Sequence, residues 1–436
     1  MNMQTEATRA AVAPGRRVVI MGLDGVPYSL LHEYMEQGEM PRLREMTAAG
    51  RLRPMDSTLP EVSSVAWTSF MTGKNPAAHG IFGFMELDPR TYDFRFPNFQ
   101  SLKAPPLWEE LGVAAVVCNI PQTYPARPLN GVMVSGFVAL DLHKAVYPER
   151  VFRYLQDIDY QLDVKSQLAA TDPPAFFDNL FQVFDKRAEA LLHLYDHEPW
   201  QLFIGAITET DRLHHFFFAD VRGGPHHDIF LEFYRKLDGL LWEVYTRAQR
   251  DGALFLTCSD HGFAPIKTEV YVNEYLKEQG LLALDGQEGL KSLAPATRAF
   301  CLEPARVYLH RRGKFARGAV EPEAQEEVLQ QAEGLFRDLT WNGQPVAARI
   351  FRKAEIFAGP YLDAAPDLYV LAQPGFDLKA PLNRGAVFGR SHFTGAHTYA
   401  DAHVFISRDH LLDPQAPFSI EQVPHLVRAY LLGEAD

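Results

Sequence analysis

The stretch RVVIMGLDG, residues 17–25, sets an unbroken run of apolar side chains between an arginine and Asp24. A run without polar alternation is typical of a strand that is buried on both faces. Three further runs have the same character: AAVVCNI (114–120), QLFIGAI (201–207) and ALFLTCS (253–259). Because parallel sheets are normally covered on both faces, the four runs together favour a mostly parallel core sheet.

Helical patterns separate these runs. Apolar residues recur at helical spacing in two long segments, at Leu180, Phe184, Ala188 and Leu191 and again at Phe230, Phe233, Leu237 and Leu241. Strands that alternate with helices are typical of an α/β fold with a parallel sheet. The final segment, about 420–432, also has the pattern of a helix.

The pattern of apolar and polar residues changes after about residue 268. The short strand-like run RVYLH (306–310) is followed by a basic loop and by a polar helical stretch, which suggests an inserted cap region. The runs PDLYVLA (366–372) and HVFIS (403–407) are then expected to return to the core sheet. The sequence thus predicts four parts: a flexible N-terminal tail (1–16), an α/β core (17–267), a cap or insert (268–365) and a return to the core (366–436).

Composition excludes some classes of function. The 436 residues carry a formal net charge of −13, which argues against a surface built to bind a nucleic acid polymer. Three scattered cysteines cannot form a disulfide framework. The sequence shows neither an apolar leader nor an apolar run of about 18 residues, so we expect a cytoplasmic protein without a membrane segment. The oligomeric state cannot be read from the sequence.

Acidic and histidine side chains follow several of the apolar runs. Asp24 ends the first run, Asp211 and His215 lie in ITETDRLHHFF, and Asp260 and His261 lie in LFLTCSDHGF. A later segment, SHFTGAHTYADAHVFI, offers His392, His397 and His403. Each motif alone has an ordinary explanation, because an aspartate can cap a helix and a histidine can pack in a core. His214, one position away from the Asp211–His215 pair, is expected to pack or to face solvent.

Together the motifs favour a single site, because open α/β sheets place their sites at the carboxyl ends of the strands. Asp211 and His215 are four residues apart, so one helical turn puts both on the same face. Two metal ions held about 4 Å apart by aspartate and histidine ligands suit in-line displacement at phosphorus. Such a site also needs a hydroxyl group if the reaction passes through a covalent intermediate.

The segment EVSSVAWTSFMTGKNPAAHGI, residues 61–81, offers five hydroxyl groups, those of Ser63, Ser64, Thr68, Ser69 and Thr72. It reads as a short helix that stops at Gly73. The segment alone does not say whether one of these hydroxyls is a nucleophile or all of them belong to a capped helix.

In this order, GLDG, LPEVSSVAWTSFMTGKNPAAHGI, TDRLHHFFF, SDHGF and TGAHTYADAHVFI resemble the alkaline phosphatase superfamily. The likeness runs from about residue 17 to 432 and is greatest to the type I phosphodiesterase/nucleotide pyrophosphatase branch. It implies a three-layer sandwich in which helices flank a mostly parallel central sheet, with an inserted cap. The superfamily's sulfatases are a poorer match, because SSVAW lacks their proline and arginine.

The resemblance also implies roles for individual residues. Asp24, Asp260 and His261 would hold one divalent ion, Asp211, His215 and His397 would hold a second, and both ions would be zinc, with manganese as the alternative. Ser63, nine positions before Thr72, would be the nucleophile and would contact the first ion. Ser64 and His403 remain the alternatives to Ser63 and His397, since Asp401 and Ala402 replace a glycine that usually follows the last histidine. Ala66 replaces an asparagine that binds a phosphoryl oxygen in nucleotide pyrophosphatases.

The preferred hypothesis is a two-metal phosphohydrolase that cleaves a small phosphorylated substrate, preferably a phosphodiester, through a phospho-Ser63 intermediate. A phosphomonoesterase, a phosphomutase and a non-catalytic metal-binding or interaction protein remain as alternatives. In the cap, four basic residues could hold a distal anionic group or could form a solvated loop: Arg311, Arg312, Lys314 and Arg317.

Overall fold

The computed structural model describes residues 12–435. The largest sheet within them has the strand order β2-β21-β9-β1-β8-β5-β6-β7. Its five central strands are parallel, and the strands at both edges are antiparallel. The bounds are Val18–Leu23 (β1), Arg51–Met55 (β2), Ala115–Ile120 (β5), Gly131–Ser135 (β6), Val146–Tyr147 (β7), Leu202–Ile207 (β8), Leu254–Cys258 (β9) and Ala402–Ile406 (β21).

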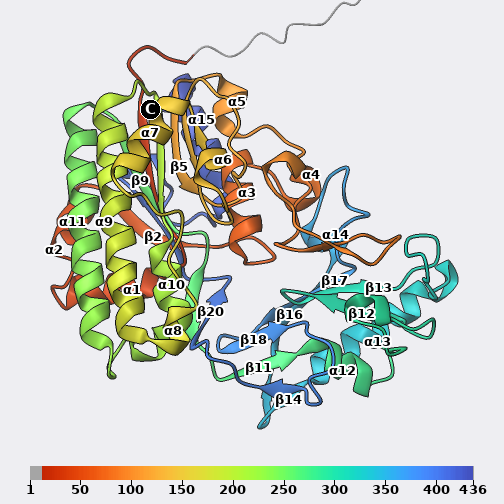
Figure 1. Cartoon of the computed structure of the whole chain (residues 1–436). Helices are drawn as coiled ribbons and strands as arrows, with labels where there is room; N and C mark the ends of the chain where they lie inside the picture. The colour runs from red at the N-terminus through yellow and green to blue at the C-terminus, as the bar shows by residue number, and fades with distance from the viewer. Residues whose placement is uncertain (1–11, 436) are drawn as a thin grey trace, which may run out of the picture.

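Helices cover both faces of this sheet, as the unbroken apolar strands predict (Figure 1). Alternate residues of β1 enter two different cores: Val19 and Met21 pack with one layer of helices, Val18 and Ile20 with the other. The first layer comprises α1 (Tyr28–Glu36), α2 (Pro41–Ala49), α7 (Glu149–Asp157), α9 (Pro173–His197), α10 (Glu209–Phe217) and α11 (His227–Arg250). The second comprises α3 (Ser63–Thr72), α5 (Leu107–Leu111) and α15 (Val423–Leu432). The chain therefore has the three-layer α/β sandwich that the sequence implies.

A smaller unit lies beside the sandwich and has its own hydrophobic core. It contains the sheet β12-β13-β17-β16 and the sheet β18-β11-β19. Its elements include β11 (Thr268–Tyr271), α12 (Val272–Glu278), β12 (Ala299–Leu302), β13 (Arg306–Leu309), α13 (Gln325–Asp338), β16 (Ala347–Arg352), β17 (Leu368–Ala372), β18 (Phe376–Lys379) and β19 (Phe388–Gly389).

One expected strand lies in a different sheet from the one predicted. The sequence places 366–372 in the core sheet, but β17 pairs with β13 and β16 in the smaller unit. The prediction was wrong because an apolar run shows that a strand is buried without showing which strand is its partner. The run at 403–407 does return to the core, where β21 pairs with β9.

The N-terminal tail expected over residues 1–16 falls mostly outside the described residues, which begin at position 12. Within the described part, the backbone N–H of Ala13 donates a hydrogen bond to the Leu431 carbonyl at 2.9 Å. This end of the tail therefore contacts the last helix.

Candidate metal centre and nucleophile

The first ligand cluster forms where two neighbouring strands end. β1 pairs in parallel with β9, so Asp24 and the Asp260–His261 pair leave the sheet side by side. His261 Nε2 lies 3.2 Å from Asp260 Oδ2 and 3.8 Å from Asp24 Oδ1. The Gly25 backbone N–H donates to Asp260 Oδ1 at 3.0 Å, and all three ligand side chains are buried.

The second cluster joins α10 to a strand that arrives much later in the chain. Asp211 and His215 lie one turn apart on α10, which follows β8. His397 lies on β20 (Gly395–Thr398), and antiparallel pairing with β10 (Gly262–Pro265) sets it opposite Phe263. Asp211 Oδ1 lies 3.3 Å from His215 Nε2 and 3.4 Å from His397 Nε2.

Backbone carbonyls fix the orientation of the three histidines in these clusters. Nδ1 of His261 lies 3.1 Å from the Gly262 carbonyl, Nδ1 of His215 lies 3.3 Å from the Gly395 carbonyl and Nδ1 of His397 lies 2.9 Å from the Glu61 carbonyl. A proton on Nδ1 satisfies each carbonyl and leaves Nε2 with a free lone pair, which is the arrangement of metal-ligating histidines. His215 Nε2 and His397 Nε2 are only 3.0 Å apart, a distance at which the two rings share a proton in a hydrogen bond or ligate the same cation.

The buried carboxylates also fit bound cations. Burial and the neighbouring carboxylates of Asp260 and Asp211 raise the pKa of Asp24 well above its usual range. Burial also raises the pKa of Asp260, to about 6. Asp211 Oδ1 and Asp260 Oδ2 are buried without a hydrogen-bond donor. Divalent ions would satisfy these oxygens and offset the repulsion between the acids, so the residues present fit a metal at each cluster.

The two clusters are adjacent. The rings of His261 and His397 stack with their centroids 3.5 Å apart, and in each cluster one ligand atom from every residue lies within 4.8 Å of the others. The structure thus brings together all six residues to which the sequence gives metal-ligand roles.

Ser63 is the first residue of α3 and faces the first cluster. Its Oγ lies 3.4 Å from Asp24 Oδ1 and 3.2 Å from His261 Nε2. Ser64 Oγ, by contrast, is fully buried without a hydrogen-bond partner. The remaining three hydroxyls bond within the segment: Thr68 and Thr72 to helix carbonyls and Ser69 to His79. The free N–H groups at the start of α3 would favour an anion beside Ser63.

The other histidines named from the sequence lie outside the clusters. His214 is buried, with Nδ1 2.9 Å from the Gly25 carbonyl and Nε2 2.9 Å from the Tyr234 hydroxyl, so it packs as expected. His403 is buried between the Val26 carbonyl and the Thr257 hydroxyl. His392 stacks on Phe216. Of the candidates in its segment, His397 alone joins a ligand cluster.

Three supporting side chains were not found from the sequence. Trp67 Nε1 donates to Asp24 Oδ2 at 3.1 Å, and Thr210 Oγ1 donates to the Asp24 carbonyl at 2.6 Å. Arg212 donates to Asp211 Oδ2 at 2.7 Å. Trp67 and Arg212 each lie within a few residues of a predicted site residue, but no spacing rule in the sequence says that they point toward it.

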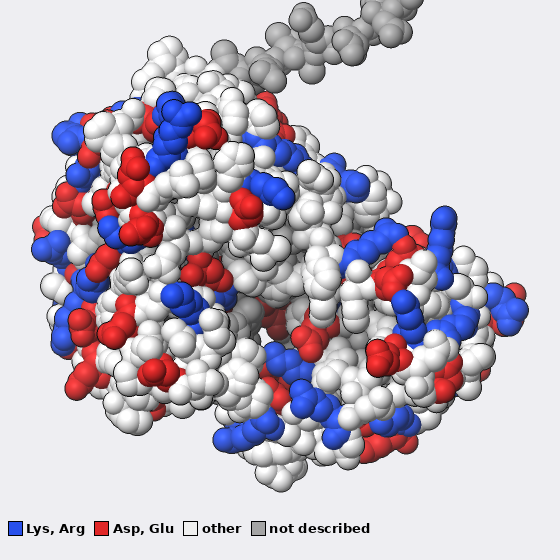
Figure 2. Space-filling model, viewed as in Figure 1, with Lys and Arg blue, Asp and Glu red and all other residues white. Residues whose placement is uncertain are grey.

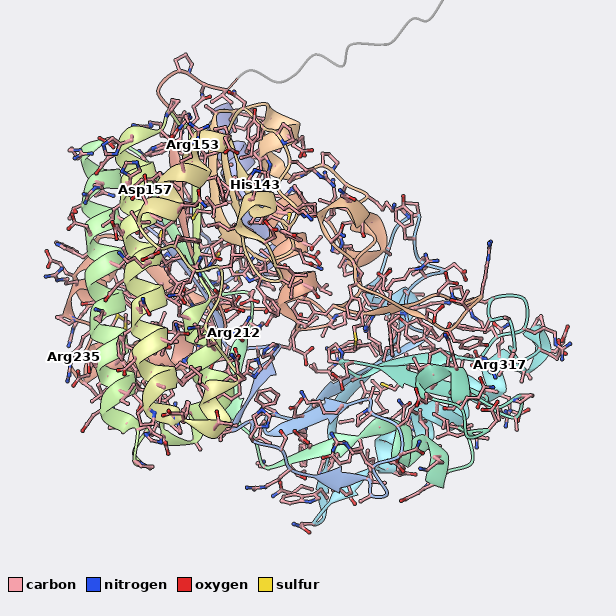
Figure 3. All side chains as sticks on the ribbon, viewed as in Figure 1. His143, Arg153, Asp157, Arg212, Arg235 and Arg317 are labelled. Atoms are coloured by element: carbon pink, nitrogen blue, oxygen red, sulfur yellow. The ribbon has the colours of Figure 1, made fainter. Side chains whose placement is uncertain are left out.

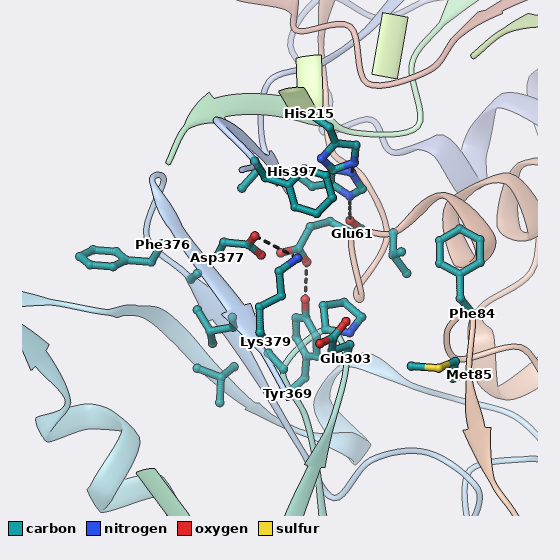
Figure 4. Close-up of a pocket in the computed structure, with 18 residues that line it drawn as sticks. Glu61, Phe84, Met85, His215, Glu303, Tyr369, Phe376, Asp377, Lys379 and His397 are labelled. Atoms are coloured by element: carbon teal, nitrogen blue, oxygen red, sulfur yellow. Dashed lines mark hydrogen bonds and ion pairs between the residues drawn. The ribbon is translucent and has the colours of Figure 1, made fainter. Parts of the chain in front are cut away.

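A cavity of about 260 Å³ opens beside the second cluster, between the sandwich and the smaller unit. Figure 2 shows the hollow between the two units, with acidic side chains visible inside it. His215 and His397 line one side of the cavity, and residues of β17 and β18 line the other (Figure 4). The smaller unit therefore completes a pocket beside the second cluster.

The four basic residues of the 311–317 loop do not line this cavity. Arg311 is paired with Asp363 and Asp367, Arg312 with Glu321 and Arg317 with Asp285. Lys314 donates to the Asp363 carbonyl. In Figure 3, Arg317 lies on the smaller unit, well away from Arg212. These side chains are held by ion pairs and backbone contacts and do not form a clamp at the metal centre.

The sandwich, with an aspartate- and histidine-rich centre at the carboxyl ends of its strands, defines a member of the alkaline phosphatase superfamily. Residues 18–400 match the family described as type I phosphodiesterase/nucleotide pyrophosphatase. The chain belongs to this family, and it is accordingly a phosphoryl-transfer hydrolase that acts on phosphate esters.

Solved structures share the fold. Phosphonoacetate hydrolase from Sinorhizobium meliloti 1021, in complex with phosphonoacetate, is similar at a TM-score of 0.66 and 17% identity, over 96% of each chain. The alkaline phosphatase PafA is similar at a TM-score of 0.61 and 14% identity, over 98% of this chain and 97% of its own. Murine ectonucleotide pyrophosphatase/phosphodiesterase 5 is similar at a TM-score of 0.55 and 13% identity, over 96% of this chain and 95% of its own. None of the helices within residues 12–435 combines the length and apolar character needed to cross a membrane.

Proposed function

We propose that this protein is a two-metal phosphodiesterase that works through a covalent phospho-Ser63 intermediate. The observation that carries the proposal is the position of the Ser63 hydroxyl, which lies at a helix N-terminus within 3.4 Å of the first ligand cluster. Membership of the type I phosphodiesterase family supports a diester as the substrate. Lys379 is the only lysine or arginine among the described residues that line the cavity, which also favours a diester over a more highly charged monoester.

Asp24, Asp260 and His261 would hold one ion, and Asp211, His215 and His397 the other. Bound divalent ions, zinc or manganese, would lower the pKa of a hydroxyl and neutralise charge on the transferring phosphoryl group. The chain itself positions the reactants: Glu61 and Gly395 carbonyls orient two of the histidines, and the start of α3 directs N–H groups toward the phosphoryl oxygens.

The chemistry divides into two displacements at phosphorus. In the first, Ser63 Oγ bonds to phosphorus as the bond from phosphorus to one ester oxygen breaks, and the proton lost by the hydroxyl ends on the departing alcohol. In the second, a water oxygen bonds to phosphorus as the bond to Ser63 Oγ breaks. One water proton returns to Ser63 Oγ, and a phosphomonoester is released.

The test replaces the proposed nucleophile. Ser63→Ala, with its metal content verified, is expected to lose at least about a thousand-fold in turnover of bis-p-nitrophenyl phosphate and of p-nitrophenyl phosphate. Ser64→Ala is the matched control, since the buried Ser64 hydroxyl touches no ligand, and it is expected to retain turnover. Wild-type turnover by metal-loaded Ser63→Ala would rule out the covalent role of Ser63.

A further inference from the structure

Another cavity, of about 170 Å³, lies between the smaller unit and the segment of chain that follows α4 (Pro76–His79). In Figure 1 this segment, in orange, reaches from α4 to the smaller unit. Of the described residues, none lines both this cavity and the one beside the second cluster. We call it the aromatic cavity, because its lining includes five aromatic side chains: Phe82, Phe300, Tyr308, Phe315 and Tyr361.

A wider depression, of about 590 Å³, adjoins the aromatic cavity. Its ionisable side chains are mostly basic: Arg90, Arg311, Arg312, Lys314 and Asp363. The backbone N–H of Ala316 donates to the Pro89 carbonyl at 2.9 Å, which holds the 311–317 loop against the segment that carries Arg90. An apolar space therefore has a basic entrance.

Lys314 belongs to the lining of both spaces. Its ammonium nitrogen lies 5.8 Å from the ring centroids of Tyr308 and Phe315, and it donates a hydrogen bond to the Asp363 carbonyl. Among residues 12–435, no carboxylate forms an ion pair with this ammonium. Lys314 thus places a positive charge where the aromatic cavity meets the basic entrance.

The carboxylates near Lys314 are already paired with other cations. Arg311 lies 3.0 Å from Asp363 and 3.8 Å from Asp367, and Lys353 lies 2.8 Å from Asp367. Burial and the neighbouring Arg311 lower the pKa of Lys314 to about 8, although Asp367 and Asp363 oppose this shift. The charge of Lys314 is therefore only partly compensated.

Two other cations of the lining lack a carboxylate partner. Within the described part of the chain, Arg90 and Lys103 form no ion pair. The remaining acid of the lining, Glu86, lies near both Lys103 and Arg306, and burial raises its pKa. One carboxyl group cannot balance these cations, so the lining keeps an excess of positive charge.

These surroundings suit a ligand with an apolar part and an anionic part. Aromatic walls favour the transfer of a hydrocarbon group out of water, and ammonium and guanidinium groups form strong hydrogen bonds with carboxylates and phosphates. A neutral apolar ligand would bury the Lys314 charge further without compensating it, and a small inorganic anion would leave the aromatic walls unfilled. The aromatic cavity is smaller than most ligand pockets, so the hydrocarbon group it admits is compact.

We propose that the aromatic cavity and its basic entrance bind an apolar organic anion, with the hydrocarbon group among the aromatic rings and the carboxylate or phosphate group at Lys314. This site is separate from the metal centre, and the inference does not depend on the proposed reaction. Octanoate and octyl phosphate are the probes, because they carry the same hydrocarbon chain and different anionic groups.

The experiment is calorimetric titration of the metal-loaded wild-type protein with the two probes, with 1-octanol and with acetate. At least one octyl anion is expected to bind about once per chain, at least about ten-fold more tightly than 1-octanol or acetate. Lys314→Met keeps a long apolar side chain, and it is expected to weaken binding of the anion at least about ten-fold. Lys267→Met is the matched control, because Lys267 is exposed and lines neither space.

A second variant tests the entrance without removing a charge. Ala364 is exposed and lines both spaces, so the indole of Ala364→Trp is expected to obstruct the entrance and to weaken binding at least about ten-fold. Unfolding midpoints of both variants, measured beside the wild type, show that the variants are folded.

The outcomes separate this site from the proposed function. Octyl anions that bind no more tightly than 1-octanol and acetate would overturn the proposal. Tight binding that neither Lys314→Met nor Ala364→Trp weakens would place the ligand elsewhere, at the metal centre for example, and would also overturn it. Turnover of bis-p-nitrophenyl phosphate, measured on the same samples, tests the proposed function alone. A preference for octanoate or for octyl phosphate identifies the anionic group, and either preference supports the site.

Discussion

Arg212 joins the second ligand cluster to the rest of the sandwich. Its guanidinium donates to Asp211 Oδ2 at 2.7 Å and also holds Asp163, with Nη2 2.8 Å from Asp163 Oδ2. A charged partner of this kind fixes the orientation of a ligating carboxylate and prevents it from turning away from the metal. Arg212 is therefore a positioning residue, although the sequence gives it no role.

Arg212→Gln is expected to weaken metal binding at the second cluster about ten- to a hundred-fold, with less effect at the first. The measurement is a metal titration that resolves two affinities. Arg222→Gln is the control, because Arg222 pairs with Glu33 at the surface and contacts no residue of either cluster. Unchanged affinity in Arg212→Gln would show that Asp211 needs no such support.

His79 makes an acid-sensitive contact with α3, the helix that begins at Ser63. The Ile81 N–H donates to His79 Nδ1 at 3.2 Å, so the ring proton lies on Nε2 and points to Ser69 Oγ at 3.0 Å. Burial lowers the pKa of His79 to about 3. Because the unfolded chain gains this proton near pH 6.5 and the folded chain does not, stability is lost as the pH falls below that value.

Between pH 7 and pH 5, His79 alone is expected to reduce the free energy of unfolding by about 2 kcal/mol. His79→Asn keeps an acceptor for the Ile81 N–H but cannot be protonated. It should therefore be less stable than the wild type at pH 7 and should show a pH dependence about 2 kcal/mol smaller. Urea unfolding at both pH values, at a fixed metal concentration, measures the difference. Parallel pH profiles would contradict a buried neutral His79.

At the scale of elements, the contact between β1 and α3 sets the position of Asp24. Trp67 lies against β1 at Gly22, where an added Cβ would lie 2.4 Å from Trp67 Cη2. Only a residue without a side chain lets the indole approach the strand this closely and reach Asp24 Oδ2. Gly22 is therefore needed for the close approach of the helix that also carries Ser63.

Gly22→Ala is expected to destabilise the fold by about 1–3 kcal/mol through overpacking, and to weaken metal binding at the first cluster. Gly239→Ala is the control, and it is expected to have the opposite effect on the free energy of unfolding. Gly239 lies inside α11 with nothing within 4 Å of an added Cβ, so alanine there should stabilise the helix by about 0.5–1 kcal/mol. Thermal or urea unfolding measures the stability of both variants. A Gly22→Ala variant as stable as the wild type would argue against the Trp67 contact.

The sequence predicts the individual strands and helices of the core well. The four central apolar runs form strands that are buried on both faces, as their mostly apolar side chains predict. Helix α3 ends at Gly73 in a left-handed conformation, as expected of a helix stop. Local patterns carry this information. Pairing partners are not local, so 366–372 is correctly a strand but lies in the sheet of the smaller unit.

In the candidate site, too, local patterns predict some features, while others depend on contacts that are not local in the sequence. Asp24, Asp211 and Asp260 each follow a central strand, and the parallel order brings them to one edge of the sheet. The choice among five hydroxyls, and between His397 and His403, depends on distances that only the folded chain has. The contacts of Arg212 with Asp163 and of Trp67 with Asp24 join residues far apart in the sequence, which no spacing argument could anticipate.

At the scale of the whole molecule, the sandwich supplies the ligand clusters and the smaller unit supplies the far wall of the cavity. β20 and β18 connect the two, because His397 belongs to the metal centre while Asp377 and Lys379 belong to the pocket. The ligand clusters and the far wall of the cavity thus come from different parts of one chain.

The proposed reaction requires two metal ions bound at the adjacent clusters. Metal analysis after loading the purified protein with zinc or manganese, followed by removal of excess ion, tests this. We predict about two ions per chain in the wild type and about one when either cluster is impaired, as in Asp211→Asn for the second and Asp260→Asn for the first. Fewer than about two ions in the fully loaded wild-type protein would contradict the two-metal centre.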